Sequence, residues 1–213
     1  RSNPLKQIHC ITWAKEFLFQ QLMGEAADES TSSESELNLA TEAAKDREAL
    51  LKEHNELLDV RQLHWNDSAE NFLHKMVSKL WVSDIVRLLF IHTLWANRTK
   101  PEPLKTLEPA EQAVNDDQNI WTVRETLRVL YDATELLQKR LPTEKSIEFD
   151  KDDEDTLNFV VAAANLRSFV FHIDLLTKFD CKQIAGNIIP AIATTNAIIS
   201  GFLALESLTF FKK

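Results

Sequence analysis

The chain has 213 residues, and 44% of them are hydrophobic, which is enough for the core of one large domain or of one domain plus part of another. Its formal net charge of −9 argues against a nucleic-acid partner, because phosphate binding requires a basic surface, and favours a basic protein partner instead. Only three glycines occur, which excludes a glycine-rich phosphate loop and favours long helices over sheets with tight turns.

The first predicted element is a helix that ends at Gly24. Pro4 is suited to the first turn of a helix, where its missing N–H group has no partner to lose. Apolar residues then recur at helical spacing, namely Ile8, Ile11, Trp13, Phe17, Leu18 and Leu22. Residues 25–36 contain five acidic residues, no basic residue and no large apolar residue, so they are predicted to form a mobile acidic loop.

Three further helices are predicted before residue 100. Residues 37–63 have the pattern of a charged helix with a narrow leucine stripe. Asp67 and Glu70 have the spacing of a helix start, with a side-chain acceptor first and a glutamate three residues later. The buried face that follows is predicted to consist of Phe72, Leu73, Met76, Val77 and Leu80.

A separate helix is predicted to start at a cap formed by Ser83 or Asp84. Its apolar residues are Ile85, Leu88, Leu89 and Leu94. Prolines and polar residues at 99–103, at Pro109 and at 115–117 then predict a long loop.

The second half of the chain is predicted to contain two long helices. The first covers residues 120–141, with Val123, Leu127, Leu130, Tyr131 and Leu137 on one side, and Pro142 ends it. Residues 146–149 are predicted to be a short extended piece. The second helix covers about residues 153–171 and buries Leu157, Phe159, Val160, Ala163, Leu166 and Val170.

The acidic run 150–155 has two interpretations. The carboxylates could bind calcium, but the run lacks the glycine and the terminal glutamate of an EF-hand loop. Carboxylates at the amino end of the next helix are favoured by the helix dipole, and this interpretation is preferred.

Cysteine and histidine patterns do not indicate a catalytic or metal site. His9 and Cys10 are adjacent, so on a helix they point about 100° apart and cannot easily share a hydrogen bond. Cys10 and Cys181 are both predicted to be buried packing residues in a reducing compartment. The six histidines show no spacing typical of zinc ligands. A cysteine hydrolase that uses Cys10 would need a histidine and a carboxylate brought to it by the fold.

The tryptophans and the apolar carboxyl end are further candidates for binding features. The five tryptophans are predicted to anchor the core or a domain face. Residues 188–205 are apolar over about the length of a membrane span, but Pro190, Asn196 and the nearby hydroxyl residues argue against a bilayer. A helix buried against a further domain explains this pattern better.

Four blocks of sequence resemble enzymes that activate ubiquitin-like modifiers. Residues 184–201, IAGNIIPAIATTNAIISG, resemble the segment that returns the chain to the adenylation domain in that family. Residues 8–15, IHCITWAK, resemble the helix that follows the thioester-forming cysteine. The SUMO-activating branch is matched by Leu94-Trp95 with KPEPL at 100–104, and by FDKDD at 149–153 with FVVAAANLR at 159–167.

The resemblance implies a fold and a division of the chain. The expected fold is mainly α, an irregular multi-helix domain with long acidic loops and a carboxyl-terminal apolar helix that returns to an adenylation domain. Residues 1–182 would form the catalytic-cysteine domain of a large catalytic subunit, and residues 183–213 the return segment and its helix. The thioester cysteine would lie just upstream of residue 1, which fits a chain that begins with arginine as a fragment of a longer protein.

The resemblance also implies a function, partners and cofactors. The domain would carry the thioester, position the activated modifier and dock the conjugating enzyme for transfer. Expected partners are the smaller subunit, SUMO and, weakly and with electrostatic help, the SUMO-conjugating enzyme, with no nucleic acid and no membrane. No catalytic, cofactor-binding or metal-binding residue is expected within this chain, which alone should be inactive. ATP, magnesium and structural zinc are implied for the full-length family member only. The implied location of the protein is the nucleus and cytoplasm.

A second class of function stays open from the residues alone. Because no catalytic group within the chain can be identified from its residues, an acidic helical interaction module without enzymatic activity fits the composition equally well. The residues just upstream of Arg1 would separate the two classes, since only the enzyme requires a cysteine there.

Overall fold

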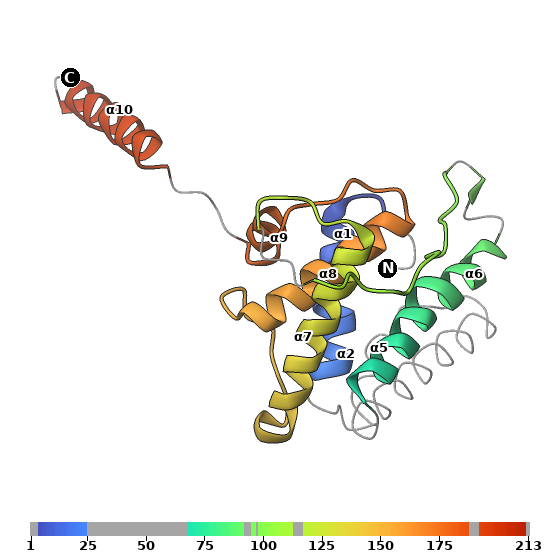
Figure 1. Cartoon of the computed structure of the whole chain (residues 1–213). Helices are drawn as coiled ribbons and strands as arrows, with labels where there is room; N and C mark the ends of the chain where they lie inside the picture. Colours follow the sequence, from blue (N-terminus) through green and yellow to red (C-terminus); the bar gives the residue numbers. More distant parts are fainter. Residues whose placement is uncertain are drawn as a thin grey trace, which may run out of the picture.

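A computed structural model describes residues 4–24, 68–91, 95–96, 98–112, 117–187 and 192–211. Within these ranges every regular element is a helix, and no strand occurs (Figure 1). The prediction of a mainly α fold is therefore confirmed. The predicted acidic loop at 25–36 and the predicted helix at 37–63 lie outside the described residues.

The first helix is continuous from Gln7 to Met23 and changes its pitch midway. It consists of α1 (Gln7–Thr12), a π-helical stretch η1 (Trp13–Phe19) and α2 (Gln20–Met23). The prediction that Pro4 occupies the first turn is wrong, because the backbone is still extended at Lys6 and the helix begins one residue later.

Gly24 ends this helix, as predicted, because the chain folds closely back on the last turn. Its N–H group donates to the carbonyl oxygen of Gln20 at 3.0 Å. A Cβ atom at residue 24 would lie 2.5 Å from that same oxygen, a distance that no side chain tolerates.

The second helix is also continuous and contains a second π-helical stretch. It consists of α5 (Ala69–Ser78), η2 (Lys79–Ser83) and α6 (Asp84–Leu89). The predicted break at Ser83 or Asp84 is wrong, since the Asp84 carboxylate accepts from Lys79 Nζ at 2.9 Å instead of capping a new helix. The predicted buried face is confirmed for Phe72, Leu73, Met76, Val77 and Leu80.

The start of α5 lies one residue later than predicted. The side chain of Ser68, not that of Asp67, is the N-terminal cap, and it accepts from the N–H group of Asn71 at 3.3 Å. The second helix ends earlier than predicted, at Leu89. Trp95 lies in a separate turn, and its indole N–H group donates to the carbonyl oxygen of Leu88.

Helix α7 (Val123–Glu144) begins with a capping box that the sequence carries but that we did not predict. The Thr122 hydroxyl accepts from the N–H group of Glu125, and the Glu125 carboxylate accepts from the N–H group of Thr122. Pro142 does not end the helix as predicted, because it lies in the last turn, and the helix continues to Glu144. Lys145 then takes a positive φ of 62°.

The segment after α7, where a short extended piece was predicted at 146–149, forms no regular element. It makes one backbone hydrogen bond to the first helix, from the N–H group of Ile147 to the carbonyl oxygen of Met23 at 2.8 Å. Asp153 then caps α8 (Glu154–Val170), whose position agrees with the prediction of about 153–171.

Helix α8 is the centre of the domain. It packs against α7, the first helix, η2 and α9 (Lys178–Ala185), and 13 of its 17 residues are buried. The residues predicted for its buried face are all buried, namely Leu157, Phe159, Val160, Ala163, Leu166 and Val170.

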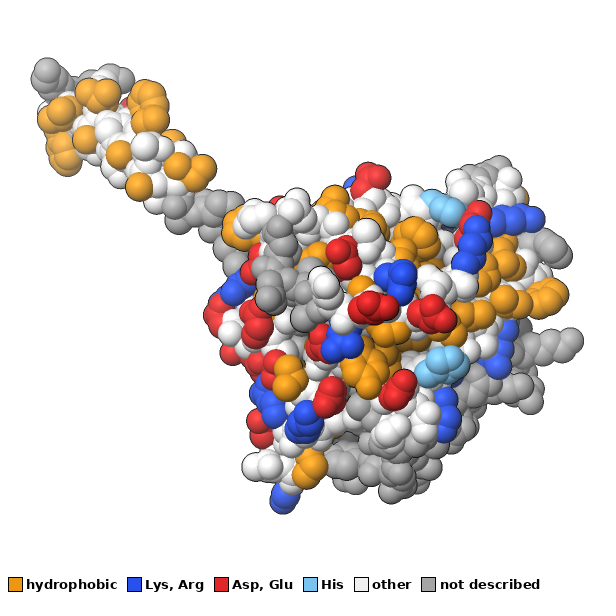
Figure 2. Space-filling model, viewed as in Figure 1, with side chains coloured by type: hydrophobic (Ala, Val, Ile, Leu, Met, Phe, Trp, Pro, Cys, Tyr) orange, Lys and Arg blue, Asp and Glu red, His pale blue; other side chains and the backbone are white. Residues whose placement is uncertain are grey.

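The last helix, α10 (Ala193–Phe211), is described apart from the other helices (Figure 1). None of its residues is buried, and Figure 2 shows hydrophobic side chains over its visible face. It is nevertheless too short or too polar to span a bilayer, and the same holds for each other helix within the described ranges.

Candidate functional site

The amino-terminal segment, residues 4–12, begins at buried Pro4, crosses the surface and re-enters the core at Cys10. Leu5 and Ile8 are exposed, whereas Cys10 and Ile11 are buried. The carbonyl oxygen of Pro4 accepts a hydrogen bond from Nη2 of Arg98 at 2.8 Å. The loop after α6 therefore holds Pro4, the first described residue of the segment, which is buried.

An arginine among aromatic rings lies behind this segment. The guanidinium carbon of Arg167 is 4.1 Å from the ring centroid of Trp13 and 5.2 Å from that of Phe171, and the residue is only 6% exposed. Trp13 meets Trp81 edge to face at a centroid distance of 6.1 Å, and Phe171 lies 6.4 Å from Trp95. We call these five residues the aromatic–arginine cluster. It joins both π-helical stretches to the carboxyl end of α8.

The two cysteines are buried, as predicted, and neither has the environment of a nucleophile. Burial raises the pKa of the Cys10 thiol, although the Ser168 hydroxyl and the Arg167 charge oppose this shift. Burial likewise raises the pKa of Cys181 to about 12. His9 lies on the exposed side, where its Nδ1 accepts from the N–H group of Leu5 at 3.1 Å. An activated thiol needs a lowered pKa, so the geometry argues against a hydrolase that uses Cys10.

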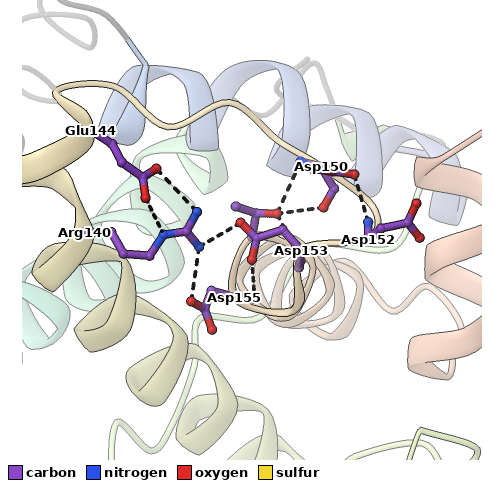
Figure 3. A network of polar contacts seen from close by, with 7 residues as sticks. Arg140, Glu144, Asp150, Asp152, Asp153 and Asp155 are labelled. Carbon is purple, nitrogen blue, oxygen red and sulfur yellow. Dashed lines mark hydrogen bonds and ion pairs between the residues drawn. The ribbon is translucent and has the colours of Figure 1, made fainter.

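The acidic run before α8 forms a capping network around Arg140 (Figure 3). Asp150 and Asp153 each accept from an N–H group two residues later, at Asp152 and Asp155. The Arg140 guanidinium reaches Asp153 at 2.7 Å and Asp155 at 3.2 Å, and these carboxylates with Glu144 raise the pKa of Arg140. The carboxylates are thus satisfied by backbone and arginine, which favours the helix-cap interpretation over calcium.

Helix α9 is held at its start by a buried lysine. Lys178 is 6% exposed, and its ammonium contacts the carboxylates of Asp117, at 3.1 Å, and Glu154. The Asn165 amide in α8 fixes Leu176, which lies two residues before α9. It donates to the carbonyl oxygen of Leu176 at 2.9 Å and accepts from the N–H group of Leu176 at 3.2 Å.

The end of α9 is held by the first helix. Lys15 Nζ donates to the carbonyl oxygen of Ala185 at 3.1 Å. The first helix therefore begins near the amino terminus of the chain and also binds the end of α9, after which the chain leaves the bundle (Figure 1).

A hollow of about 330 Å³ lies between two irregular segments, residues 102–106 and 172–175. Val123 and the half-exposed ring of Phe169 contribute to its wall. Charges of both signs lie along it, from Glu102, Lys105 and Asp174. The hollow was not predicted: residues 102–104 belong to the KPEPL block, but that block indicated a family and not a cavity.

The described residues contain neither a cluster of possible metal ligands nor a glycine-rich phosphate loop. No group of three or more His, Cys, Asp or Glu side chains there could hold a metal ion. The three glycines of the chain are Gly24, Gly186 and Gly201, which are too far apart in sequence to form one phosphate loop.

Four of the five tryptophans are buried, as predicted for core anchors: Trp13, Trp81, Trp95 and Trp121. Trp65 lies outside the described residues, as do His54, His64 and His92.

Residues 91–182 match the family model for the SCCH domain of ubiquitin-activating enzymes. The matched range contains α7, α8 and the start of α9, together with Arg98, Asn165 and Arg167. It begins after α6, so the first helix lies outside it.

Curated relatives cover nearly the whole chain. The chain is 43% identical over 214 residues to the ubiquitin-activating enzyme E1-like protein of Saccharomyces cerevisiae. The alignment covers 98% of the chain and 33% of that protein. It is 35% identical to the SUMO-activating enzyme subunit uba-2 of Caenorhabditis elegans, over 97% of the chain and 38% of the relative. SUMO-activating enzyme subunit 2 of Dictyostelium discoideum is also 35% identical, over 98% and 33%. The chain thus spans about a third of the length of these relatives.

Proposed function

Because the chain belongs to the family of enzymes that activate ubiquitin and ubiquitin-like modifiers, we propose that it is the catalytic-cysteine domain of the large subunit of a SUMO-activating enzyme. The observation that carries the proposal is the similarity to two SUMO-activating subunits over 97% and 98% of the chain. This similarity includes the amino-terminal helix, which the SCCH family model does not cover.

The proposed parent reaction has three steps. ATP adenylates the carboxyl-terminal carboxylate of the modifier, with release of pyrophosphate. A cysteine thiolate then attacks the acyl carbon, so that a C–S bond forms, the C–O bond to the phosphate breaks and AMP leaves. Finally the acyl group passes to the cysteine of a conjugating enzyme by exchange of one thioester for another. ATP, magnesium and structural zinc are assigned to other parts of the full-length protein, since the described residues do not fit them.

The proposed role of this chain is to hold the thiol and the bound modifier in place. The nucleophile is proposed to lie upstream of residue 1, on the segment that continues into Pro4. Two features support this role. The amino-terminal segment is fixed at Pro4 by Arg98 and in the core by Cys10 and Ile11. Both cysteines of the chain are buried thiols with raised pKa values, so neither competes as a nucleophile.

Docking of the conjugating enzyme is the second part of the proposed function. A net charge of −9 would speed encounter with a basic partner, and exposed charges act only within about 8–10 Å at physiological salt. We expect a dissociation constant on the order of 10–100 μM, because a loaded conjugating enzyme must leave. The dissociation constant should rise steeply with salt, because salt screens the charges that attract the partner. Titration of labelled conjugating enzyme at two salt concentrations, followed by NMR, measures this affinity.

The test of the whole proposal uses the full-length protein with its smaller subunit. We expect this enzyme to act in the nucleus and cytoplasm. The complex is incubated with ATP, magnesium and either SUMO or ubiquitin, and adducts are resolved on non-reducing gels. A thiol-sensitive adduct with SUMO and not with ubiquitin is expected. Cys10→Ala and Cys181→Ala should keep the adduct, whereas replacement of the upstream cysteine by alanine should remove it.

Two results would contradict the proposal. An adduct that requires Cys10 or Cys181 would move the nucleophile into this chain. An adduct with neither modifier would favour the acidic interaction module without enzymatic activity. The chain of 213 residues alone should form no adduct in the same assay.

A further inference from the structure

The amino-terminal segment is held by two arginines that lie far apart in sequence. Arg98 donates to the backbone of Pro4, before the helix begins, and Arg167 lies over the ring of Trp13, nearly two turns into the helix. The two contacts grip the segment on either side of α1. Neither arginine is close enough in sequence to be a local helix cap, so both contacts depend on the tertiary fold.

The contact with Arg167 is part of a larger attachment of the helix to α8. Cys10 precedes Trp13 by three residues and lies on the same helical face. The Ser168 hydroxyl, next to Arg167 in sequence, hydrogen bonds to the Cys10 side chain. Trp13 in turn packs edge to face on Trp81 of η2. The position of Trp13 therefore sets the direction in which the first helix leaves the core.

Small changes in that direction are amplified at the amino end. From Trp13 to Gln7 the helix rises about 9 Å, so a tilt of about 10° at Trp13 would move the helix start by about 1.5 Å. Pro4 and any residue upstream of it would move further unless Arg98 held them. Misplacement of a reacting group by about 1 Å can slow a reaction by about 100-fold.

We propose that Arg98 and Arg167 are positioning residues for thioester formation, Arg98 through the Pro4 carbonyl and Arg167 through Trp13. The inference rests on the proposed function, in which the nucleophile lies just upstream of residue 1. The two residues touch neither the modifier nor the thiol. They act on the thioester step alone, because adenylation does not require the thiol.

The choice of arginine at the two sites follows from their geometry. A guanidinium is planar and weakly hydrated, so it can stack on a tryptophan inside the core, which a lysine ammonium does less well. At Pro4 the requirement is simpler, since a single donor to a carbonyl oxygen suffices. Lysine should therefore replace Arg98 more successfully than Arg167.

The experiment compares Arg167→Met, Arg167→Lys, Arg98→Met and Arg98→Lys in the full-length enzyme with its smaller subunit. Adenylation is followed by ATP–pyrophosphate exchange, and thioester formation by single-turnover kinetics. Exchange should stay close to that of the wild type in all variants. The single-turnover rate should fall about tenfold in Arg167→Met and about threefold in Arg98→Met, with recovery in Arg98→Lys.

A matched control separates positioning from general loss of stability. Phe159 packs on Phe19, at the other end of the same helix, with ring centroids 5.6 Å apart. Phe159→Leu should lower the melting temperature but leave the single-turnover rate unchanged. If it slows thioester formation as much as Arg167→Met, the positioning role is refuted. The same holds if pyrophosphate exchange falls in parallel with the thioester rate.

A second measurement needs no modifier and is made on the chain itself. Hydrogen exchange of the backbone amides at 7–12 should be about tenfold faster in Arg167→Met and Arg98→Met, with α7 unchanged. Unchanged exchange at 7–12 would overturn the inference even if the enzyme is active. Failure of the wild type to form any thioester would instead refute the proposed function, and hydrogen exchange would then decide alone whether the two arginines fix the segment.

Discussion

Helices α8 and α10 are alike in composition and opposite in environment. Both are rich in alanine, leucine and phenylalanine, with valine added in α8 and isoleucine in α10, and neither has a clear polar face. In α8 13 of 17 residues are buried, whereas none of the 19 residues of α10 is. Phe202, Leu203 and Phe211 of α10 are 61%, 63% and 84% exposed.

This difference teaches what apolar composition can and cannot indicate. A helix that is apolar on all sides needs neighbours on all sides, and the composition predicts that need. It does not say which part of the protein meets it. For α8 the neighbours are the other helices of this bundle. In α10 large apolar residues are exposed instead, and we propose that an adenylation domain outside this chain covers them.

The largest difference in stability between the two helices is expected when one phenylalanine in each is replaced by alanine. Phe159→Ala removes a fully buried ring from α8 and should lower the free energy of unfolding by about 3–5 kcal/mol. Phe202→Ala in α10 should change it by less than about 0.5 kcal/mol. Urea denaturation of the two variants measures both values. A large loss in Phe202→Ala would mean that α10 packs on the bundle in solution.

A pair of asparagines sharpens the comparison for polar groups. Asn165→Ala leaves the partly buried N–H and carbonyl groups of Leu176 without their partner and should destabilise the chain by about 1–3 kcal/mol. Asn196→Ala on exposed α10 should stay within about 0.5 kcal/mol. Equal effects of the two substitutions on urea denaturation would contradict the assigned role of the Asn165 amide.

The buried thiol of Cys181 predicts a pH dependence. Burial raises its pKa from 9.0 to about 12, so the folded state disfavours the thiolate. This contribution to stability is fully present below pH 9 and is lost as the pH rises towards about 12. Between pH 8 and pH 10 the wild type should therefore lose about 1 kcal/mol more than Cys181→Ala. Denaturation of both proteins at the two pH values tests this, and equal losses would show that the thiol titrates normally.

The smallest effect is expected from removal of α10 itself. Truncation after Asn187 should leave the free energy of unfolding within about 0.5 kcal/mol and raise solubility, because it deletes exposed apolar surface. Truncation after Lys182, the predicted domain boundary, should be more harmful, since it removes buried Ala185 and the carbonyl oxygen that Lys15 binds. If both truncations have the same melting temperature as the full chain, the last turn of α9 does not belong to the core.

Much of the helical content could be predicted because it is encoded locally. The buried faces of α5 and α8 follow from apolar residues at helical spacing, and all eleven residues predicted for these faces are buried. The errors lie at boundaries. At Asp84 an ion pair with Lys79 replaces a cap, and at Pro142 the helix tolerates proline in its last turn. The capping box of Thr122 and Glu125 was a readable signal that the prediction missed.

The candidate site was less predictable than the fold. Arg98, Asn165 and Arg167 stand in blocks that matched the family or lie beside them, yet their spacing alone assigns no role to any of them. Their partners, Pro4, Leu176 and Trp13, are 94, 11 and 154 positions away in the chain. Pairing over such distances depends on the path of the whole chain, which a local pattern does not contain.

The sequence by itself determined the helical class, the burial of both cysteines and the need of the last helix for a partner, since composition and periodicity express these directly. Only the tertiary structure decided that the second helix continues past Asp84, that two arginines hold the amino-terminal segment, and that α10 receives no cover from the described bundle. The reason is physical. Local propensity and amphipathicity act within a few turns, whereas the ion pairs, stacked rings and carbonyl contacts of this domain join residues that only the folded chain brings together.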